Sequence, residues 1–251
     1  ITHDASYHDM YYMNYDDTLL FKKRMPTSAM VPYTEFCKNH EHPERVMRLL
    51  FNDDDYWKNH LNANKLYEVL FKQASNVQST ELRNSMSLYD LFTDDEIYDL
   101  WLINNAWWYI NYGACPLNGG NQPYSQRNLL RKIISDADSC IALPHPGVTL
   151  RYGHDTMVMP LTCLMDLDEM GMQVSDLEQL AYKGWNNYRI FPMACNIQFV
   201  FYHKKGSKDI LVKVLRNENE ATLPIKTDIA PYYHWKDVRQ FYLDKINKFT
   251  E

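Results

Sequence analysis

Apolar positions recur with a helical period over most of the first 145 residues and with a strand period after them. Apolar residues three and four positions apart lie on one face of a helix. This spacing predicts helices around residues 43–52, 56–77 and 93–113, and a fourth from about residue 125. The apolar stripe of the fourth helix consists of Leu129, Leu130, Ile133 and Ile134. The intervening string ACPLNGGNQPY is rich in Pro, Gly and Asn, so it is expected to be a loop.

The helix expected around 93–113 has the strongest local signals. Thr93 and Glu96 have the spacing of a capping box, in which each side chain bonds the backbone N–H of the other residue. Asp94 and Asp95 follow at the positive end of the helix, where negative charge is favourable. The residues that follow one face of this helix are Ile97, Leu100, Trp101, Asn104 and Trp108.

Beyond residue 145 the pattern predicts strands separated by a helix. The string GVTLRYG, 147–153, alternates as a short strand does, and MVMPLTCLMDL, 157–167, is typical of a buried helix with Pro160 near its first turn. Two β-rich runs within 195–217 flank Gly206 and predict a hairpin, and 234–249 predicts a closing amphipathic helix. The chain is therefore expected to have an α/β fold.

Glycine usage supports a division of the chain into two parts. All eight glycines lie at or after Gly113, and a stretch without glycine favours helices joined by polar loops over tightly turned sheets. We expect a mainly helical lobe over residues 1–140. An α/β part over residues 141–251 would then carry the strands, the hairpin and the last helix.

Composition excludes several classes of protein. Apolar residues make up 45% of the 251 residues and charged residues 23%, which is typical of a globular protein, and no apolar run is long enough to span a membrane. A net charge of −6 argues against a nucleic-acid partner, although one basic pocket could still bind a small anion. The five cysteines contain no C-x-x-C, so neither a zinc knuckle nor a dense disulfide framework is indicated.

The adjacent His154 and Asp155 are the first candidate for chemistry. They lie between the expected strand and the expected helix, where the helix offers unpaired N–H groups to an anion. An imidazole can donate to a phosphate oxygen, and a protonated carboxyl group can give its proton to a leaving alkoxide. The alternative is a purely structural role, in which Asp155 caps the helix. The same dipeptide occurs twice within the first ten residues, in a polar setting that does not suggest a site.

Three other groups are weaker candidates. Arg151 points to the opposite side of the expected strand from Leu150, so it could approach the same pocket. Arg127 and Arg131 are one helical turn apart and could face an anion together, although surface charge is the simpler interpretation. The string NHEHPE, 39–44, could supply metal ligands, but histidines two positions apart among surface residues are usually solvated. No metal site is therefore predicted.

The string GHDTMVMPLTCLM resembles the second signature of the histidine acid phosphatases, a branch of the phosphoglycerate-mutase-like superfamily that includes phytases and inositol polyphosphate phosphatases. The specific part runs from Gly153 to Thr156, a Gly-His-Asp-Thr element. The string LRNENEATLPI, 215–225, looks like a turn familiar from the same family. The resemblance implies a phosphoglycerate-mutase-like mixed sheet flanked by helices, with a large helical lobe.

The resemblance also implies a reaction. A nucleophilic histidine would attack the phosphorus of a small phosphomonoester, with inositol phosphates as the leading substrates, and form a phosphohistidine. Asp155 would protonate the leaving alcohol and His154 would bind the phosphoryl oxygens. No metal or other cofactor is implied, and the family resemblance suggests a periplasmic or secreted protein.

The sequence departs from the family at the nucleophile, which an Arg-His-Gly element carries. None of the nine histidines here follows an arginine. The chain also starts without an initiator Met or an apolar leader. We therefore expect the 251 residues to be the carboxyl-terminal portion of a longer phosphatase, inactive without its amino-terminal segment. The alternatives are a pseudoenzyme or noncatalytic phospholigand-binding protein of the same fold, and a metal-dependent hydrolase that uses the His-rich start.

Overall fold

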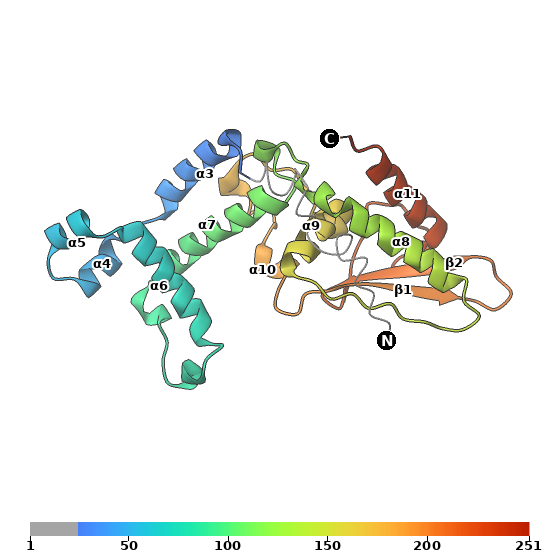
Figure 1. Cartoon of the computed structure of the whole chain (residues 1–251), viewed down its shortest axis with the longest axis horizontal. Helices are drawn as coiled ribbons and strands as arrows, with labels where there is room; N and C mark the ends of the chain where they lie inside the picture. The colour runs from blue at the N-terminus through green and yellow to red at the C-terminus, as the bar shows by residue number, and fades with distance from the viewer. Residues whose placement is uncertain (1–24, 251) are drawn as a thin grey trace. The chain divides into compact units, whose positions relative to one another are not determined.

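The structure, a computed structural model, describes residues 25–250 (Figure 1). They form two compact units, which we call the helical unit, residues 30–107, and the α/β unit, residues 108–250 with 25–29. The expected boundary near residue 140 separates kinds of secondary structure, whereas these units are separated by packing. The two other His-Asp dipeptides, at residues 3–4 and 8–9, lie outside the described residues.

The helical unit is built from short helices around an apolar centre. Its elements, including the two helices that cross into the α/β unit, are α3 (Thr27–His40), α4 (Glu44–Leu50), α5 (Asp54–His60), α6 (Ala63–Val77), η2 (Glu81–Asn84), η3 (Tyr89–Leu91) and α7 (Asp94–Tyr112). Its buried core consists of Val46, Met47, Trp57, Tyr67, Ala74, Phe92 and Leu100. The helices predicted around 43–52 and 93–113 are confirmed as α4 and α7, whereas α3 was not predicted.

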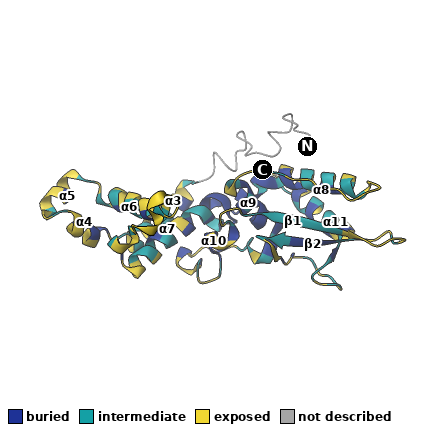
Figure 2. Cartoon of the chain, turned by 90° about the horizontal axis from the view of Figure 1, so that it is seen from below, coloured by how far each residue is buried: buried dark blue, intermediate teal, exposed yellow. Residues whose placement is uncertain are grey.

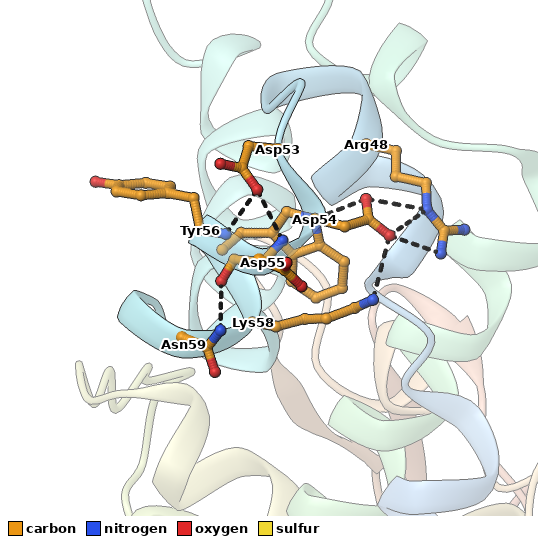
Figure 3. A network of polar contacts seen from close by, with 8 residues as sticks. Arg48, Asp53, Asp54, Asp55, Tyr56, Lys58 and Asn59 are labelled. Atoms are coloured by element: carbon orange, nitrogen blue, oxygen red, sulfur yellow. Dashed lines mark hydrogen bonds and ion pairs between the residues drawn. The ribbon is translucent and has the colours of Figure 1, made fainter.

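The helix predicted over 56–77 is wrong as a single element, because two helices with separate caps replace it. Asp53 caps α5 by accepting hydrogen bonds from the backbone nitrogens of Asp55 and Tyr56, at 2.9 and 3.0 Å (Figure 3). Asn62 caps α6 by accepting from the nitrogen of Lys65 at 3.0 Å. Apolar periodicity continues through the break, but a side chain that bonds the backbone starts a new helix there.

The start of α7 is the predicted capping box. The backbone nitrogen of Thr93 donates to Glu96 Oε2 at 2.8 Å, and the nitrogen of Glu96 donates to Thr93 Oγ1 at 3.3 Å. The predicted apolar face holds only for the first turns, where Leu100 is buried. Further along, Asn104 is exposed, and Tyr109 with its neighbour Ile110 is fully buried.

The α/β unit packs three long helices against a small sheet (Figure 1). Its further elements are η4 (Pro116–Asn118), η5 (Gln122–Gln126), α8 (Arg127–Ile141), α9 (Asp155–Met165), η6 (Leu167–Glu169), η7 (Leu177–Gln179), α10 (Asn187–Ile190), β1 (Ile197–His203), β2 (Ile210–Arg216), β3 (Asn219–Glu220), β4 (Tyr233–His234) and α11 (Trp235–Asn247). Residues from α8, α9, α11 and the strands share one buried core, which Figure 2 shows in dark blue.

The expected α/β class is confirmed, and the pairing of every described strand is antiparallel. Strand β2 lies at the centre, with β1 on one side and with β3 and β4 on the other. The predicted hairpin is β1–β2, and Gly206 in its turn has φ +83°. The turn expected within 215–225 joins β2 to β3 through Asn217 and Glu218, which both have positive φ. The helices predicted from 125, over 157–167 and over 234–249 are confirmed as α8, α9 and α11.

Two predictions around α9 are wrong. Residues 147–153 form no sheet ladder with the described residues, because no described strand lies beside them. Helix α9 begins at Asp155, so Pro160 lies in its second turn rather than near its first. Among residues 25–250, no helix is both long and apolar enough to cross a membrane.

Candidate functional site

His154 and Asp155 lie side by side at the amino-terminal end of α9. His154 is the N-cap residue, with extended backbone at φ −124° and ψ 165°, and its side chain does not cap the helix. Asp155 is the first helical residue, and its Oδ1 accepts a hydrogen bond from the backbone nitrogen of Thr156 at 2.8 Å. Both side chains are exposed. The predicted pair is thus presented to solvent at the positive end of a helix dipole, where an anion is favoured.

The rest of α9 is held firmly inside the α/β unit. Eight of its residues are buried: Met157, Met159, Pro160, Leu161, Thr162, Cys163, Leu164 and Met165. Its last carbonyl groups accept hydrogen bonds from α11, with Lys245 Nζ donating to the oxygen of Leu164 at 2.6 Å and the Tyr242 hydroxyl to that of Met165 at 2.8 Å. Burial lowers the pKa of Lys245, and the nearby Asp166 carboxylate opposes this effect. Because α9 is buried and its final carbonyl groups are hydrogen-bonded, the position of its amino-terminal end, which carries His154 and Asp155, is fixed.

The segment 147–153, which leads into the site, has two different sides. Val148, Leu150 and Tyr152 are 81%, 69% and 85% exposed. Between them, Thr149 and Arg151 contact α8: the Thr149 hydroxyl lies 3.4 Å from Cys140 Sγ, and the Arg151 guanidinium forms an ion pair with Asp136. Figure 1 shows the segment running back from the end of α8 to the start of α9. Alternate side chains therefore face opposite ways, as in a strand, and the apolar side faces solvent.

Arg151, the third predicted site residue, thus has a carboxylate partner. Its side chain does point away from Leu150 and Tyr152, as the alternation predicted. It bonds Asp136, whose other carboxylate oxygen accepts from Lys132 Nζ at 2.6 Å. In this arrangement Arg151 anchors the segment that ends in His154.

Cys195 is a neighbour of the site that sequence reasoning missed. Burial raises the pKa of its thiol, and the Asp155 carboxylate raises it further. The residue lies in the loop before β1, forty positions away in the chain, so no local spacing could place it near Asp155. The proton stays on this thiol at neutral pH, which argues against a role as a nucleophile.

The other candidates from the sequence are engaged in structural contacts. Arg131 donates to Asn247 Oδ1 at 2.7 Å, and Arg127 donates to the carbonyl oxygen of Tyr124 at 3.0 Å. His40 Nδ1 lies 2.7 Å from Asp99 Oδ1. Within the described part of the chain, no group of three or more His, Cys, Asp or Glu side chains is placed to hold a metal ion.

Comparison with known structures identifies the fold of the chain. The chain has the fold of the histidine acid phosphatases, in the form that inositol polyphosphate phosphatases have. The multiple inositol polyphosphate phosphatase of Bifidobacterium longum in complex with inositol hexasulfate superposes with a TM-score of 0.61 at 16% identity, over 94% of this chain. The apo form of that enzyme gives 0.60 at 15% identity, over 96% of the chain.

Sequence comparison points to the same class. A stretch of 123 residues, 44% of this chain, is 28% identical to multiple inositol polyphosphate phosphatase 1 of Gallus gallus. No family model matches the chain. The chain is thus homologous to inositol polyphosphate phosphatases by sequence and structure. It spans only 27% of the Gallus gallus relative and 57% and 59% of the two solved chains, well short of their full length.

Proposed function

We propose that this chain supplies the proton donor and a phosphate ligand of an inositol polyphosphate phosphatase whose nucleophile lies on a segment outside these 251 residues. The observation that carries the proposal is the exposed His154–Asp155 pair at the start of α9, in a chain homologous to such phosphatases. The substrate class follows from what those relatives are named for. A small phosphomonoester, such as an inositol phosphate, is the substrate that we assign.

The geometry supports distinct roles for the two residues. His154 lies at the N-cap position, so its imidazole can bind phosphoryl oxygens at the positive end of the helix dipole. Asp155 follows in the first turn, one residue further along. When a histidine nitrogen attacks phosphorus and the P–O ester bond breaks, the leaving oxygen takes a proton from Asp155 in its protonated form.

The exposed apolar side chains of 147–153 support the proposal that a further segment of the protein packs there. In a folded protein, three apolar side chains at alternate positions normally face a core. Val148, Leu150 and Tyr152 instead face solvent, directly before His154. A further segment that covered them would also lie next to the site, where a nucleophile is required. From the resemblance to the family alone, we propose a periplasmic or secreted location.

The test is phosphate release from inositol hexakisphosphate. We expect no release by the 251-residue chain alone and release by a protein that also contains the segment encoded upstream of Ile1. In that longer protein, Asp155→Asn should lower kcat by a factor of about 10²–10⁴, the usual contribution of a general acid. Asp176→Asn, which changes an exposed carboxylate at the start of η7, is the matched control and should leave kcat unchanged.

Two results would contradict the proposal. One is unchanged turnover in Asp155→Asn. The other is a longer protein that binds inositol hexakisphosphate but releases no phosphate from it or from any other monoester. The second result would favour the alternative of a noncatalytic phospholigand-binding protein.

A further inference from the structure

The side chain of His234 lies between two carboxylates that come from different loops. Its Nδ1 is 2.8 Å from Asp209 Oδ2, in the connection between β1 and β2, and its Nε2 is 3.2 Å from Asp228 Oδ1, in the connection between β3 and β4. His234 itself is the last residue of β4 and the N-cap residue of α11. One ring thus joins two loops to the start of a helix.

A neutral imidazole cannot satisfy both contacts. It has one N–H donor and one lone pair, and a carboxylate oxygen only accepts hydrogen bonds. Two carboxylates on the two ring nitrogens therefore require the imidazolium form, which donates from both. A cation at a helix amino terminus is unfavourable by itself, since the helix dipole is positive there. The bonds to Asp209 and Asp228 raise the pKa of His234 above its ordinary value of 6.5, and they outweigh burial, which lowers it.

The two carboxylates differ in what they would do if the ring lost its proton. The Asp209 side chain is 44% exposed and makes the shorter contact, whereas that of Asp228 is 80% exposed. A neutral ring protonated at Nδ1 keeps the bond to Asp209. Its Nε2 lone pair then faces the Asp228 carboxylate, and two electron-rich atoms repel each other. Asp228 can move into water at little cost because it is already mostly solvated.

The loop that carries Asp228 is closed by a few internal hydrogen bonds, which open more readily once Asp228 is no longer fastened to His234. Thr227 Oγ1 donates to the carbonyl oxygen of Tyr232 at 2.7 Å, and the nitrogen of Tyr232 donates to the oxygen of Ile229 at 2.9 Å. We propose that protonated His234 is a clasp that fastens residues 227–232 to the sheet, and that loss of its proton releases this loop while Asp209 stays bound.

Other charged groups nearby do not bond the ring. Lys213 on β2 pairs with Glu220 at 2.9 Å and lies above the ring of Tyr232 at 5.6 Å. His203 Nε2 on β1 is 2.9 Å from the carbonyl oxygen of Ser207. The remaining charged side chains of these loops and of the first turn of α11 are Lys204, Lys205, Lys208, Lys226, Lys236 and Asp237. Among residues 25–250, Asp209 and Asp228 are the charged groups that bond the ring, so the clasp depends on them.

The proposal is tested on the full chain by NMR of ¹⁵N-labelled histidine and by amide hydrogen exchange. We expect His234 to titrate above pH 6.5, to carry protons on both nitrogens below that titration and to become the Nδ1–H tautomer above it. The protection factors of the Ile229 and Tyr232 amides, which donate hydrogen bonds inside this loop, should fall severalfold as the pH rises through this titration. Those of 204–209 should change less, because the bond to Asp209 remains.

Two variants separate the clasp from a general effect of pH. His234→Gln cannot titrate, so the protection factors of its 227–232 loop should not follow pH. His203→Gln, on β1, which β2 separates from β4, should behave like the wild type. Asp228→Asn changes a side chain that is 80% exposed, and it should lower the pKa of His234. The clasp is wrong if His234 titrates at or below 6.5, or if the loop responds to pH equally in His234→Gln.

Discussion

At the scale of single residues, Tyr109 shows how one buried hydroxyl holds a loop. It lies near the end of α7 and is fully buried. Its hydroxyl donates to the carbonyl oxygen of Met172 at 3.1 Å and accepts from the nitrogen of Val174 at 2.7 Å. Tyr109→Phe would leave the buried N–H of Val174 without its acceptor. We expect this variant to lose about 1–3 kcal/mol of the free energy of unfolding of the α/β unit.

The measurement is urea unfolding of both proteins, with amide exchange of Val174 as a local probe. Tyr182→Phe is the matched control, because Tyr182 is 89% exposed and the same change there should alter stability by no more than about 0.5 kcal/mol. Equal effects at the two positions would contradict this role of Tyr109. So would an unchanged exchange rate at Val174 in Tyr109→Phe.

The sequence predicted that His154 and Asp155 lie just before a helix, and they lie at the start of α9. It did not predict the residues that surround them. The partner of Arg151, Asp136, is fifteen positions earlier, and Cys195 is far along the chain. Such contacts depend on how α8 and the loop before β1 pack, and no periodicity encodes that.

At the scale of elements, Glu96 connects the start of α7 to α4. Arg45 donates to Glu96 Oε1 at 2.8 Å and to the carbonyl oxygen of Leu91 at 2.6 Å. Burial raises the pKa of Glu96, but the hydrogen bonds from Arg45 and from Thr93 lower it by more, so it lies below the ordinary 4.5. A carboxylate with a lowered pKa stabilises the fold above the pKa it has when unfolded. This stabilisation is lost as the pH falls through the lower, folded value.

Glu96→Gln should therefore make the helical unit less stable at pH 7 but less sensitive to acid below about pH 4.5. Thermal unfolding followed from pH 7 to pH 3 measures both effects. Glu81→Gln, an exposed change at the start of η2, should keep the acid sensitivity of the wild type. If Glu96→Gln keeps the same slope of stability with pH as the wild type, the ion pair does not contribute as described.

The elements also show where patterns are reliable. The capping box of α7 and the hairpin around Gly206 were predicted correctly, because both depend on residues within a few positions. The break between α5 and α6 was missed, since Asn62 interrupts the backbone without interrupting the apolar spacing. The alternation over 147–153 predicted the correct side-chain directions but not a sheet. A ladder needs a neighbouring strand, and alternation within one segment does not reveal whether that strand is present.

At the scale of the whole molecule, packing divides the chain differently from secondary-structure type. Helix α8 lies in the part expected to be the helical lobe, yet its buried residues Leu130 and Ile134 belong to the core around the sheet. From the sequence one can predict where glycines first occur and where strands replace helices. One cannot predict which amphipathic helix packs on the sheet, because this depends on the topology of the chain.

The exposed side of 147–153 leads to a prediction for the chain as a whole. An apolar segment with strand-like alternation tends to associate with another chain when nothing covers it. Leu150→Lys should therefore reduce concentration-dependent self-association of the 251-residue chain, measured by analytical ultracentrifugation. Val31→Lys is the matched control, because Val31 is 66% exposed and Leu150 69%, but Val31 lies on α3 in the helical unit. It should leave self-association unchanged.

The same variant also tests what normally covers this surface. If the upstream segment of the proposed phosphatase packs on Val148, Leu150 and Tyr152, then Leu150→Lys should weaken binding of that segment, while Val31→Lys should not. In the longer protein, amides 147–153 should exchange much more slowly than in the chain alone, because hydrogen bonds to a neighbouring strand would protect them. Equal exchange in both proteins would mean that the upstream segment does not cover this surface. The apolar side chains would then need another partner, and a second copy of the chain would be the first to examine.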